Sequence, residues 1–209
     1  MSMVDPPIPG DASPMKGEDG VRRAKQWLEA TTRVVSSYTI KDPVGANRLS
    51  FDWPDNKHSY SYDLGGVLYG EPFHQTHFVA EVKMYETGSD QGAHYDKFLA
   101  QSYAHISQFG QRMYEHFFYI TWSPFRATTW KEQISIDAAQ KAIIKHADKV
   151  FPSHAAATDQ DVLDSIDAYT IQRLVDSVWL IVLADKQEEL VASVEDRALI
   201  AQQRIIKGD

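Results

Sequence analysis

The most informative stretch of the chain runs Phe78-Val79-Ala80-Glu81-Val82-Lys83-Met84-Tyr85. Val82 and Met84 alternate there with Glu81 and Lys83, and this period of two is typical of a β-strand. Side chains two residues apart project from the same face of a strand, so Glu81 and Lys83 share a face. The stretch therefore predicts a strand that ends with an acid and a base side by side.

The residues before this strand alternate in the same way. Two runs carry the apolar positions, which are Leu49, Phe51 and Trp53 in the first and Tyr60, Tyr62 and Leu64 in the second. Turn-forming residues punctuate the runs at Pro54-Asp55-Asn56, Gly65-Gly66 and Gly70-Glu71-Pro72. Together with residues 78–85, the two runs predict a three-stranded antiparallel meander.

Segments with helical spacing flank this region, and one further apolar strand follows it. The expected segments are a helix from near Glu18 to Val34 and Val35, a helix over 92–111, a strand over 117–122, a helix over 130–150 and a mostly helical remainder over 158–207. Periodicity leaves residues 178–183 open as either a strand or a buried helix. This order predicts an α/β fold in which a mixed central sheet of four to five strands is flanked by helices.

The chain divides into three parts. Residues 1–17 contain four prolines and two glycines and predict a mobile tail. Residues 18–150 are expected to form the core, and residues 151–209 a mostly helical C-terminal section that packs on the core or on a partner. That section has five basic and eleven acidic groups, whereas residues 22–57 have seven and four and residues 110–150 have six and four. A nucleic acid is therefore expected to face the two basic segments.

The overall composition excludes several classes of protein. The chain has 209 residues, and its 29 acidic groups against 21 basic ones give a formal charge of −8, which excludes a chain-wide basic surface for nucleic acid. It has no cysteine, which excludes disulfides, cysteine-ligated zinc, iron–sulfur clusters and thiol catalysis. No apolar run approaches the ~18 residues of a membrane span, and the N-terminus does not resemble a secretory signal. We therefore expect a cytoplasmic protein that does not enter a membrane.

An aspartate upstream of the Glu-Val-Lys stretch adds a second acid. If Asp63 ends one strand and Glu81 lies on its neighbour, their carboxylates converge at one end of the sheet. Two carboxylates and a backbone carbonyl, here that of Val82, form an oxygen site suited to Mg²⁺ or Mn²⁺. Lys83 beside that metal can orient or activate an attacking water. The arrangement suits metal-assisted hydrolysis of a phosphodiester.

These residues resemble the PD-(D/E)XK, or restriction-endonuclease-like, nuclease superfamily. The likeness rests on Asp63-Leu64-Gly65-Gly66, the linking hairpin and Glu81-Val82-Lys83, and it covers about residues 17–123. Tyr62 stands where the family often has a proline, a departure that the family tolerates. The resemblance implies a restriction-endonuclease-like core in which the two acids and the lysine are catalytic and the metal is Mg²⁺ or Mn²⁺.

The resemblance also implies supporting residues on two helices. Family members place a metal-holding glutamate on the first helix, and Glu18 is the match here. In the RecB-like branch, a glutamine and a tyrosine approach the active site from the helix that follows the lysine strand. Gln101 and Tyr103 lie on that helix with a shorter separation than usual, and Gln91 and Tyr95 form a rival pair with the usual separation.

The sequence thus favours a metal-dependent nuclease that hydrolyses DNA, as one component of a defence or mobile-element system by family analogy. The charge of −8 argues against tight nonspecific binding by the chain alone. DNA is therefore expected to be delivered with a homodimer partner or a separate recognition subunit. The alternative is a non-catalytic interaction or scaffold protein on a degenerate nuclease core, with residues 158–207 as its working surface.

Two other groups of residues have a functional and a structural interpretation. His74, His77 and His94 could bind zinc, or they could be exposed hairpin residues. An aromatic group after the fourth strand could stack on unpaired bases, or it could form an edge of the core. The residues of this group are Trp122, Phe125, Arg126 and Trp130.

Overall fold

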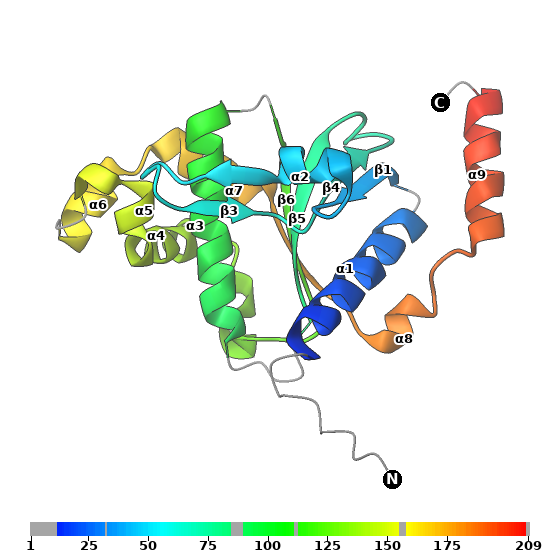
Figure 1. Ribbon diagram of the computed structural model, residues 1–209, viewed down its shortest axis with the longest axis horizontal. Helices are drawn as coiled ribbons and strands as arrows, with labels where there is room; N and C mark the ends of the chain where they lie inside the picture. The colour runs from blue at the N-terminus through cyan, green and yellow to red at the C-terminus, as the bar shows by residue number, and fades with distance from the viewer. Residues whose placement is uncertain (1–11, 32, 85–89, 111–112, 155–157, 208–209) are drawn as a thin grey trace, which may run out of the picture.

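A mixed five-stranded sheet forms the centre of the computed structural model, which describes residues 12–31, 33–84, 90–110, 113–154 and 158–207 (Figure 1). The strands follow the order β1-β4-β5-β6-β7, with the bounds Val34–Thr39, Leu64–Leu68, His77–Lys83, His116–Thr121 and Val178–Val182. β4 is antiparallel to both β1 and β5, whereas β6 and β7 extend the sheet parallel to β5. This arrangement confirms the predicted α/β class with a mixed central sheet.

Helices and a small second sheet surround this centre. The second sheet pairs β2 (Ser50–Asp52) with β3 (Ser59–Ser61). The helices are α1 Ala12–Ala30, α2 Pro43–Leu49, α3 Gln91–Phe109, η2 Ala127–Glu132, α4 Ile136–Lys145, α5 Ala147–Val150, η3 Pro152–His154, α6 Asp159–Ser165, α7 Ala168–Ser177, α8 Asp185–Glu188 and α9 Val194–Lys207. Within the described part of the chain, none of these helices is both long enough and apolar enough to cross a membrane.

The two faces of the sheet are covered by different helices (Figure 1). Alternation along β5 sends Phe78 and Ala80 into the apolar cluster beneath α1, and Val79 into the cluster beneath α3. Glu81 and Lys83 follow Val79 at intervals of two residues and therefore face α3. The sheet thus has one purely structural face and one face that carries polar groups at the end of β5.

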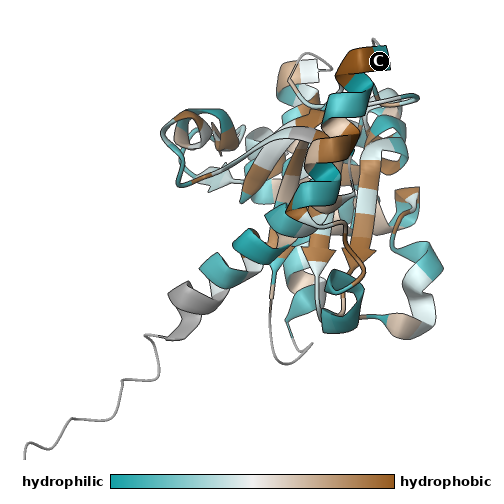
Figure 2. Ribbon diagram, turned by 90° about the vertical axis from the view of Figure 1, so that its right-hand side faces the viewer, coloured by the Kyte–Doolittle hydropathy of each residue, from teal (hydrophilic) through white to brown (hydrophobic). Residues whose placement is uncertain are grey.

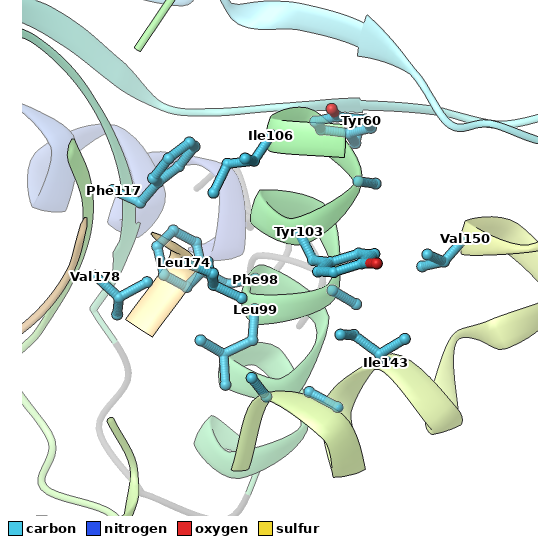
Figure 3. Close-up of a cluster of buried hydrophobic side chains, with 14 of the residues drawn as sticks. Tyr60, Phe98, Leu99, Tyr103, Ile106, Phe117, Ile143, Val150, Leu174 and Val178 are labelled. Atoms are coloured by element: carbon cyan, nitrogen blue, oxygen red, sulfur yellow. The ribbon is translucent and has the colours of Figure 1, made fainter. Parts of the chain in front are cut away.

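The larger core lies between the sheet and helices α3, α4 and α7 (Figure 3). Phe117 of β6 and Phe98 of α3 are both fully buried there. Ile143 of α4 and Leu174 of α7 close the cluster from the other side of α3. Burial of these large side chains is the main favourable contribution to folding, and it fixes α3 against the sheet.

The antiparallel meander uses different strands from those that the sequence predicted. It consists of β1, β4 and β5, whereas residues 50–52 and 59–61 pair with each other outside the central sheet. The predicted first helix was too long, because α1 ends at Ala30 and Val34 begins β1. β1 has the sequence Val-Val-Ser-Ser-Tyr-Thr, and its β-branched and aromatic residues favour a strand.

Gly65-Gly66 lies inside β4 instead of interrupting it. A Cβ atom on Gly66 would lie 2.3 Å from the carbonyl oxygen of Ser36 and 2.7 Å from the ring of Phe78. The absence of a side chain therefore lets β4 pair closely with β1 while the Phe78 ring packs over it. The prediction of a turn at the two glycines was wrong. Close packing within the sheet requires them, and the periodicity of the sequence carries no information about that packing.

The remaining elements follow the prediction with local differences. α3 and β6 match the helix over 92–111 and the strand over 117–122, although Gln111 lies outside the described residues. The expected helix over 130–150 is divided into η2, α4 and α5, because the hydroxyl of Ser135 caps a new helix by accepting from the N–H of Ala138 at 3.1 Å. Residues 178–182 form the strand β7. α1 begins at Ala12, ahead of Glu18, and residues 1–11 of the expected tail lie outside the described residues.

Replacing Gly66 tests the close approach between β1 and β4. We expect Gly66→Ala to lower the free energy of unfolding by about 2 kcal/mol or more, because the new methyl group overlaps backbone atoms. Gly17→Ala is the matched control, because nothing lies within 4 Å of its Cβ position in α1. That control should leave the protein unchanged or stabilise it by about 0.5–1 kcal/mol. Equal effects of the two changes in urea denaturation would contradict this account.

The buried His105 predicts a loss of stability in weak acid. Its side chain is fully buried against Phe51, with ring centroids 4.6 Å apart, and burial lowers its pKa to about 4. The folded state favours the neutral ring. The stability that this preference contributes is therefore fully present above pH ~6.5 and is lost as the pH falls toward 4. The expected cost is about 3 kcal/mol over that range. Urea denaturation between pH 7 and 4.5 should show a shallower pH dependence for His105→Leu, whereas exposed His74→Leu should follow the unaltered protein.

Candidate active site

Asp63 and Glu81 lie opposite each other where β4 begins and β5 ends. The register pairs Leu64 with Ala80, and the N–H of Asp63 donates to the carbonyl of Ala80 at 2.9 Å. The Asp63 carboxylate accepts from the N–H of Val82 at 2.8 Å. The side chain of Asp63 is thereby held along the edge of β5. The carbonyl of Val82 lies on the same edge of the strand as its N–H, so it is directed to the side of β5 on which Asp63 lies.

Lys83 completes this group of charges. Its ammonium lies 2.6 Å from the carboxylate of Glu81, and the two side chains are only 20% and 14% exposed. Both residues project toward α3, as the alternation of β5 requires. The structure therefore brings together Asp63, Glu81, Val82 and Lys83, the four residues that the sequence grouped in one site.

The electrostatics of the two acids are unfavourable. Burial raises the pKa of Glu81, the nearby Asp63 carboxylate raises it further, and the Lys83 ammonium opposes both effects. Burial also raises the pKa of Asp63, while the charge of Lys83 and the hydrogen bond from Val82 work against this. Two partly buried carboxylates at short range favour a bound cation or proton. Such perturbed groups are concentrated at functional sites.

The first turns of α3 add further charge to the site. Burial raises the pKa of Glu81, and the charge of Lys97 makes a small contribution that opposes this rise. Burial lowers the pKa of His94, and the charge of Lys83 lowers it further, so His94 lies close to the end of β5. The sequence analysis missed Lys97 and considered His94 only as a zinc ligand. The sequence contained one signal for these residues. His94 and Lys97 are three apart, so they share a face at the start of the helix that follows the Lys83 strand.

Gln91 and Tyr95 both contact Tyr119 on this face of the sheet. The amide oxygen of Gln91 accepts from the hydroxyl of Tyr119 at 2.9 Å, and Tyr119 is the register partner of Glu81. Gln91 is fully buried, and no residue in the described part of the chain forms a hydrogen bond with its amide nitrogen. Tyr95 packs edge-on against Tyr119 and donates its hydroxyl to the carbonyl of Gln133 at 3.0 Å.

The first pair that the resemblance suggested, Gln101 and Tyr103, lies further along α3. Gln101 is buried ten residues after Gln91, a separation of about 15 Å along a helix. The hydroxyl of Tyr103 accepts from the N–H of Asp167 at 3.0 Å, and its ring packs near Phe151. Tyr103 therefore connects α3 to the N-terminus of α7 and faces away from the sheet.

Glu18 lies near the site without touching the two acids. Its carboxylate pairs with Lys41. The residue before Lys41 is Ile40, and the N–H of Ile40 donates to the carbonyl of Asp63 at 3.1 Å. Two residues further along α1, a Cβ atom on Gly20 would lie 2.9 Å from the Cβ of Met84. The start of α1 thus packs beside the end of β5, and Glu18 is on the element that would have to supply a further acid.

The zinc hypothesis is wrong for the three histidines. His77 begins β5, whereas His94 lies at its other end beside Lys83. His74 is exposed and packs on Tyr69, with ring centroids 4.9 Å apart. Among the described residues, no three His, Cys, Asp or Glu side chains form a group that could hold a metal ion. The sequence separation of the three histidines gave no information about the distances between their side chains in the folded sheet.

The aromatic residues after β6 pack in two places, Phe125 with Trp130 in one and Trp122 in the other. Phe125 is 5% exposed and packs against Tyr95 with ring centroids 5.4 Å apart. The indole N–H of Trp122 donates to Glu188 at 2.6 Å. Arg126 pairs with Asp96 at 2.8 Å, and Asp96 also pairs with Lys145 at 2.6 Å. These contacts agree with the core-edge interpretation, and they neutralise part of the basic charge of residues 110–150. Trp130 packs edge-on against Phe125, with ring centroids 6.1 Å apart.

The donor set of the site suits a hard divalent cation. Two carboxylate oxygens and one backbone carbonyl are the ligands that Mg²⁺ and Mn²⁺ prefer, with water in the remaining positions. A cation there would relieve the repulsion between the carboxylates of Asp63 and Glu81. It would neutralise these two groups in place of the Lys83 ammonium. No protein-family model, curated protein or solved structure matches this chain.

Removing the Lys83 charge tests the electrostatic description of the site. In metal-free buffer we expect Lys83→Met to lower the free energy of unfolding by about 1–3 kcal/mol, because two partly buried carboxylates lose their neutralising partner. Lys41→Met is the matched control, because its pair with Glu18 is mostly exposed and such pairs contribute about 0–1 kcal/mol. Equal losses in the two variants, measured by urea denaturation, would contradict the description.

Proposed function

We propose that the chain is a divalent-metal-dependent nuclease with a restriction-endonuclease-like core. The order of elements supports this fold. α1 is followed by the antiparallel strands β1, β4 and β5, then by α3, and then by β6 parallel to β5. This is the helix, three-strand meander, helix and strand that the family resemblance implies, although the meander includes β1 in place of the first predicted strand.

The convergence of Asp63, Glu81 and Lys83 at one end of the sheet carries the proposal. Asp63 lies before β4, and the other two residues end β5, as the Asp-Leu-Gly-Gly and Glu-Val-Lys motifs imply. A structural explanation of the group has to account for two partly buried acids whose pKa values are both raised by burial, that of Glu81 also by the charge of Asp63. A solvated strand end would leave such side chains in water, where their repulsion is weak.

Each residue has a distinct role in the proposed reaction. The carboxylates of Asp63 and Glu81 and the carbonyl of Val82 would hold the metal ion, with Glu18 in support from α1. A bound Mg²⁺ or Mn²⁺ supplies a Lewis acid that polarises a phosphoryl oxygen and lowers the pKa of an attacking water. Lys83 orients that water and stabilises the negative charge that develops on the phosphate.

DNA is the proposed substrate, on the family resemblance. Lys83 and Lys97 provide positive charge near Glu81 that would favour the phosphate backbone. The charge of the whole chain is −8, so affinity for DNA depends on a homodimer partner or a separate recognition subunit. A role in a defence or mobile-element system, and a location in the cytoplasm, remain part of this proposal by analogy.

A cleavage assay tests the proposed activity directly. Supercoiled, linear duplex and single-stranded DNA are incubated with Mg²⁺, with Mn²⁺ or with EDTA. We expect metal-dependent cleavage that falls at least ~100-fold in Glu81→Gln and Lys83→Met, because these groups hold the metal and stabilise transition-state charge. Exposed Glu71→Gln and Lys57→Met are the matched controls and should keep full activity.

Calorimetry with Mg²⁺ and Mn²⁺ distinguishes a protein that binds metal without cleaving DNA from a protein that has no metal site. The unaltered protein should bind either ion, and Asp63→Asn should weaken binding at least ~10-fold through the loss of one charged ligand. A folded protein that neither binds metal nor cleaves any substrate would contradict the nuclease and favour the scaffold alternative. Metal binding without cleavage would instead indicate that a partner subunit is required.

A further inference from the structure

A cavity of about 470 Å³ lies at the end of the sheet opposite the candidate active site. Residues of α7 line one side of it, Phe73 and its neighbours between β4 and β5 line another, and Glu115 and His116 lie where β6 begins. Because β6 is parallel to β5, this end is separated from Lys83 by the length of β5, about 20 Å. The volume is within the range of small-molecule binding sites.

The outer face of α7 supplies one polar wall of this cavity. Tyr169, Arg173 and Asp176 line it at intervals of four and three residues, which places them on one face of the helix. Ile171 and Leu174 lie on another face and are buried in the larger core. α7 is therefore fixed against the domain by its apolar side, and its polar side is presented to the cavity.

Three charged side chains line the cavity, and no ion pair neutralises any of them within the described part of the chain. They are Glu115, Arg173 and Asp176. The Glu115 carboxylate accepts from the N–H of His77 at 2.7 Å, and the Asp176 carboxylate accepts from the amide of Gln172 at 2.9 Å. The Nε of Arg173 is buried and has no hydrogen-bond partner among the described residues. The cavity therefore offers charges of both signs to a ligand.

His116 adds an uncharged donor between these groups. The strands of the central sheet are mainly hydrophobic (Figure 2), and His116 lies at the start of one of them. The indole N–H of Trp179 donates to its Nδ1 at 3.3 Å. Because an indole nitrogen only donates, Nδ1 is unprotonated and the neutral ring carries its proton on Nε2. Burial lowers the pKa of His116, the Glu115 carboxylate opposes this, and the charge of Arg173 adds to it, so both charges lie near the ring.

The mixture of charges selects a zwitterionic ligand. A purely anionic ligand would meet the carboxylates of Glu115 and Asp176, and a purely cationic one would meet the guanidinium of Arg173. A molecule with a carboxylate and an ammonium complements both signs at once, and the planar guanidinium matches a carboxylate in geometry. The rings of Phe73 and Tyr169 add aromatic surface to the cavity, which favours an aromatic group on the ligand.

We propose that this cavity binds a free α-amino acid with an aromatic side chain. Arg173 holds its carboxylate, with the Nε2–H of His116 as a second donor. Glu115 and Asp176 hold its ammonium, and its ring packs on Phe73. The inference does not rest on the proposed nuclease activity, because these residues lie at the other end of β5 from the candidate active site.

Isothermal titration calorimetry with phenylalanine in metal-free buffer tests the proposal. Three analogues each lack one recognised feature: 3-phenylpropionate lacks the ammonium, 2-phenylethylamine the carboxylate, and glycine the ring. We expect phenylalanine to bind, and each analogue to bind at least ~10-fold more weakly, because each loses a charge-assisted hydrogen bond or the aromatic contact. Absence of phenylalanine binding, or an analogue that binds equally well, would overturn the proposal.

Two variants separate the roles of the charges. Arg173→Met should weaken phenylalanine binding at least ~10-fold, because the ligand carboxylate loses its charged partner. Asp176→Asn should weaken phenylalanine binding and leave the weaker binding of 3-phenylpropionate unchanged, since only the amino acid carries an ammonium. Exposed Lys57→Met is the matched control and should bind phenylalanine as the unaltered protein does. Equal affinities of Arg173→Met and Lys57→Met, with the fold verified by circular dichroism, would contradict the assigned site.

Trp179 reports where the ligand binds. Its indole N–H donates to His116, which lines the cavity, whereas Trp53 is buried in the larger core. Phenylalanine should shift the indole resonance of Trp179 in a heteronuclear NMR spectrum, identified by its absence in Trp179→Phe, and should leave that of Trp53 in place. A shift of the Trp53 resonance without one of Trp179 would overturn the location.

Discussion

The hydrogen bonds between the start of β4 and the end of β5 are the interaction on which the candidate site depends. The N–H of Asp63 donates to Ala80, and the carboxylate of Asp63 accepts from Val82. Because both bonds involve backbone atoms of β5, the position of one acid is tied to the strand that carries the other. The close pairing of β1 with β4 at Gly66 holds this end of the sheet in place.

The same geometry makes the site electrostatically unfavourable. Asp63 and Glu81 lose hydration and repel each other, and Lys83 offsets only part of this effect. The apolar cores on both faces of the sheet supply the stability that tolerates such an arrangement. A site that is unfavourable in the resting protein and suited to a divalent cation is easier to explain by function than by folding.

The C-terminal section has two structural roles. β7 extends the central sheet parallel to β6, and Glu188 of α8 binds Arg23 of α1 at 2.9 Å and Trp122 at 2.6 Å. This part belongs to the domain. α9, in contrast, leaves Val194, Leu199, Ile205 and Ile206 exposed. Within the section that was expected to pack on the core or on a partner, β7 and α8 are therefore joined to the core, whereas α9 adds no residue to either apolar cluster.

The sequence by itself determined the elements whose signal is local. Alternation in residues 78–85 predicted β5 and the shared face of Glu81 and Lys83, and helical spacing predicted α3. The tertiary structure decided which segments pair, since β1 was hidden at the end of a helical pattern and Gly66 was interpreted as a turn. It also decided that Lys97 and Gln91, instead of Tyr103, lie toward the site. Periodicity reports the geometry of one backbone segment, whereas register, burial and charge contacts depend on residues far apart in the chain, which only the folded structure brings together.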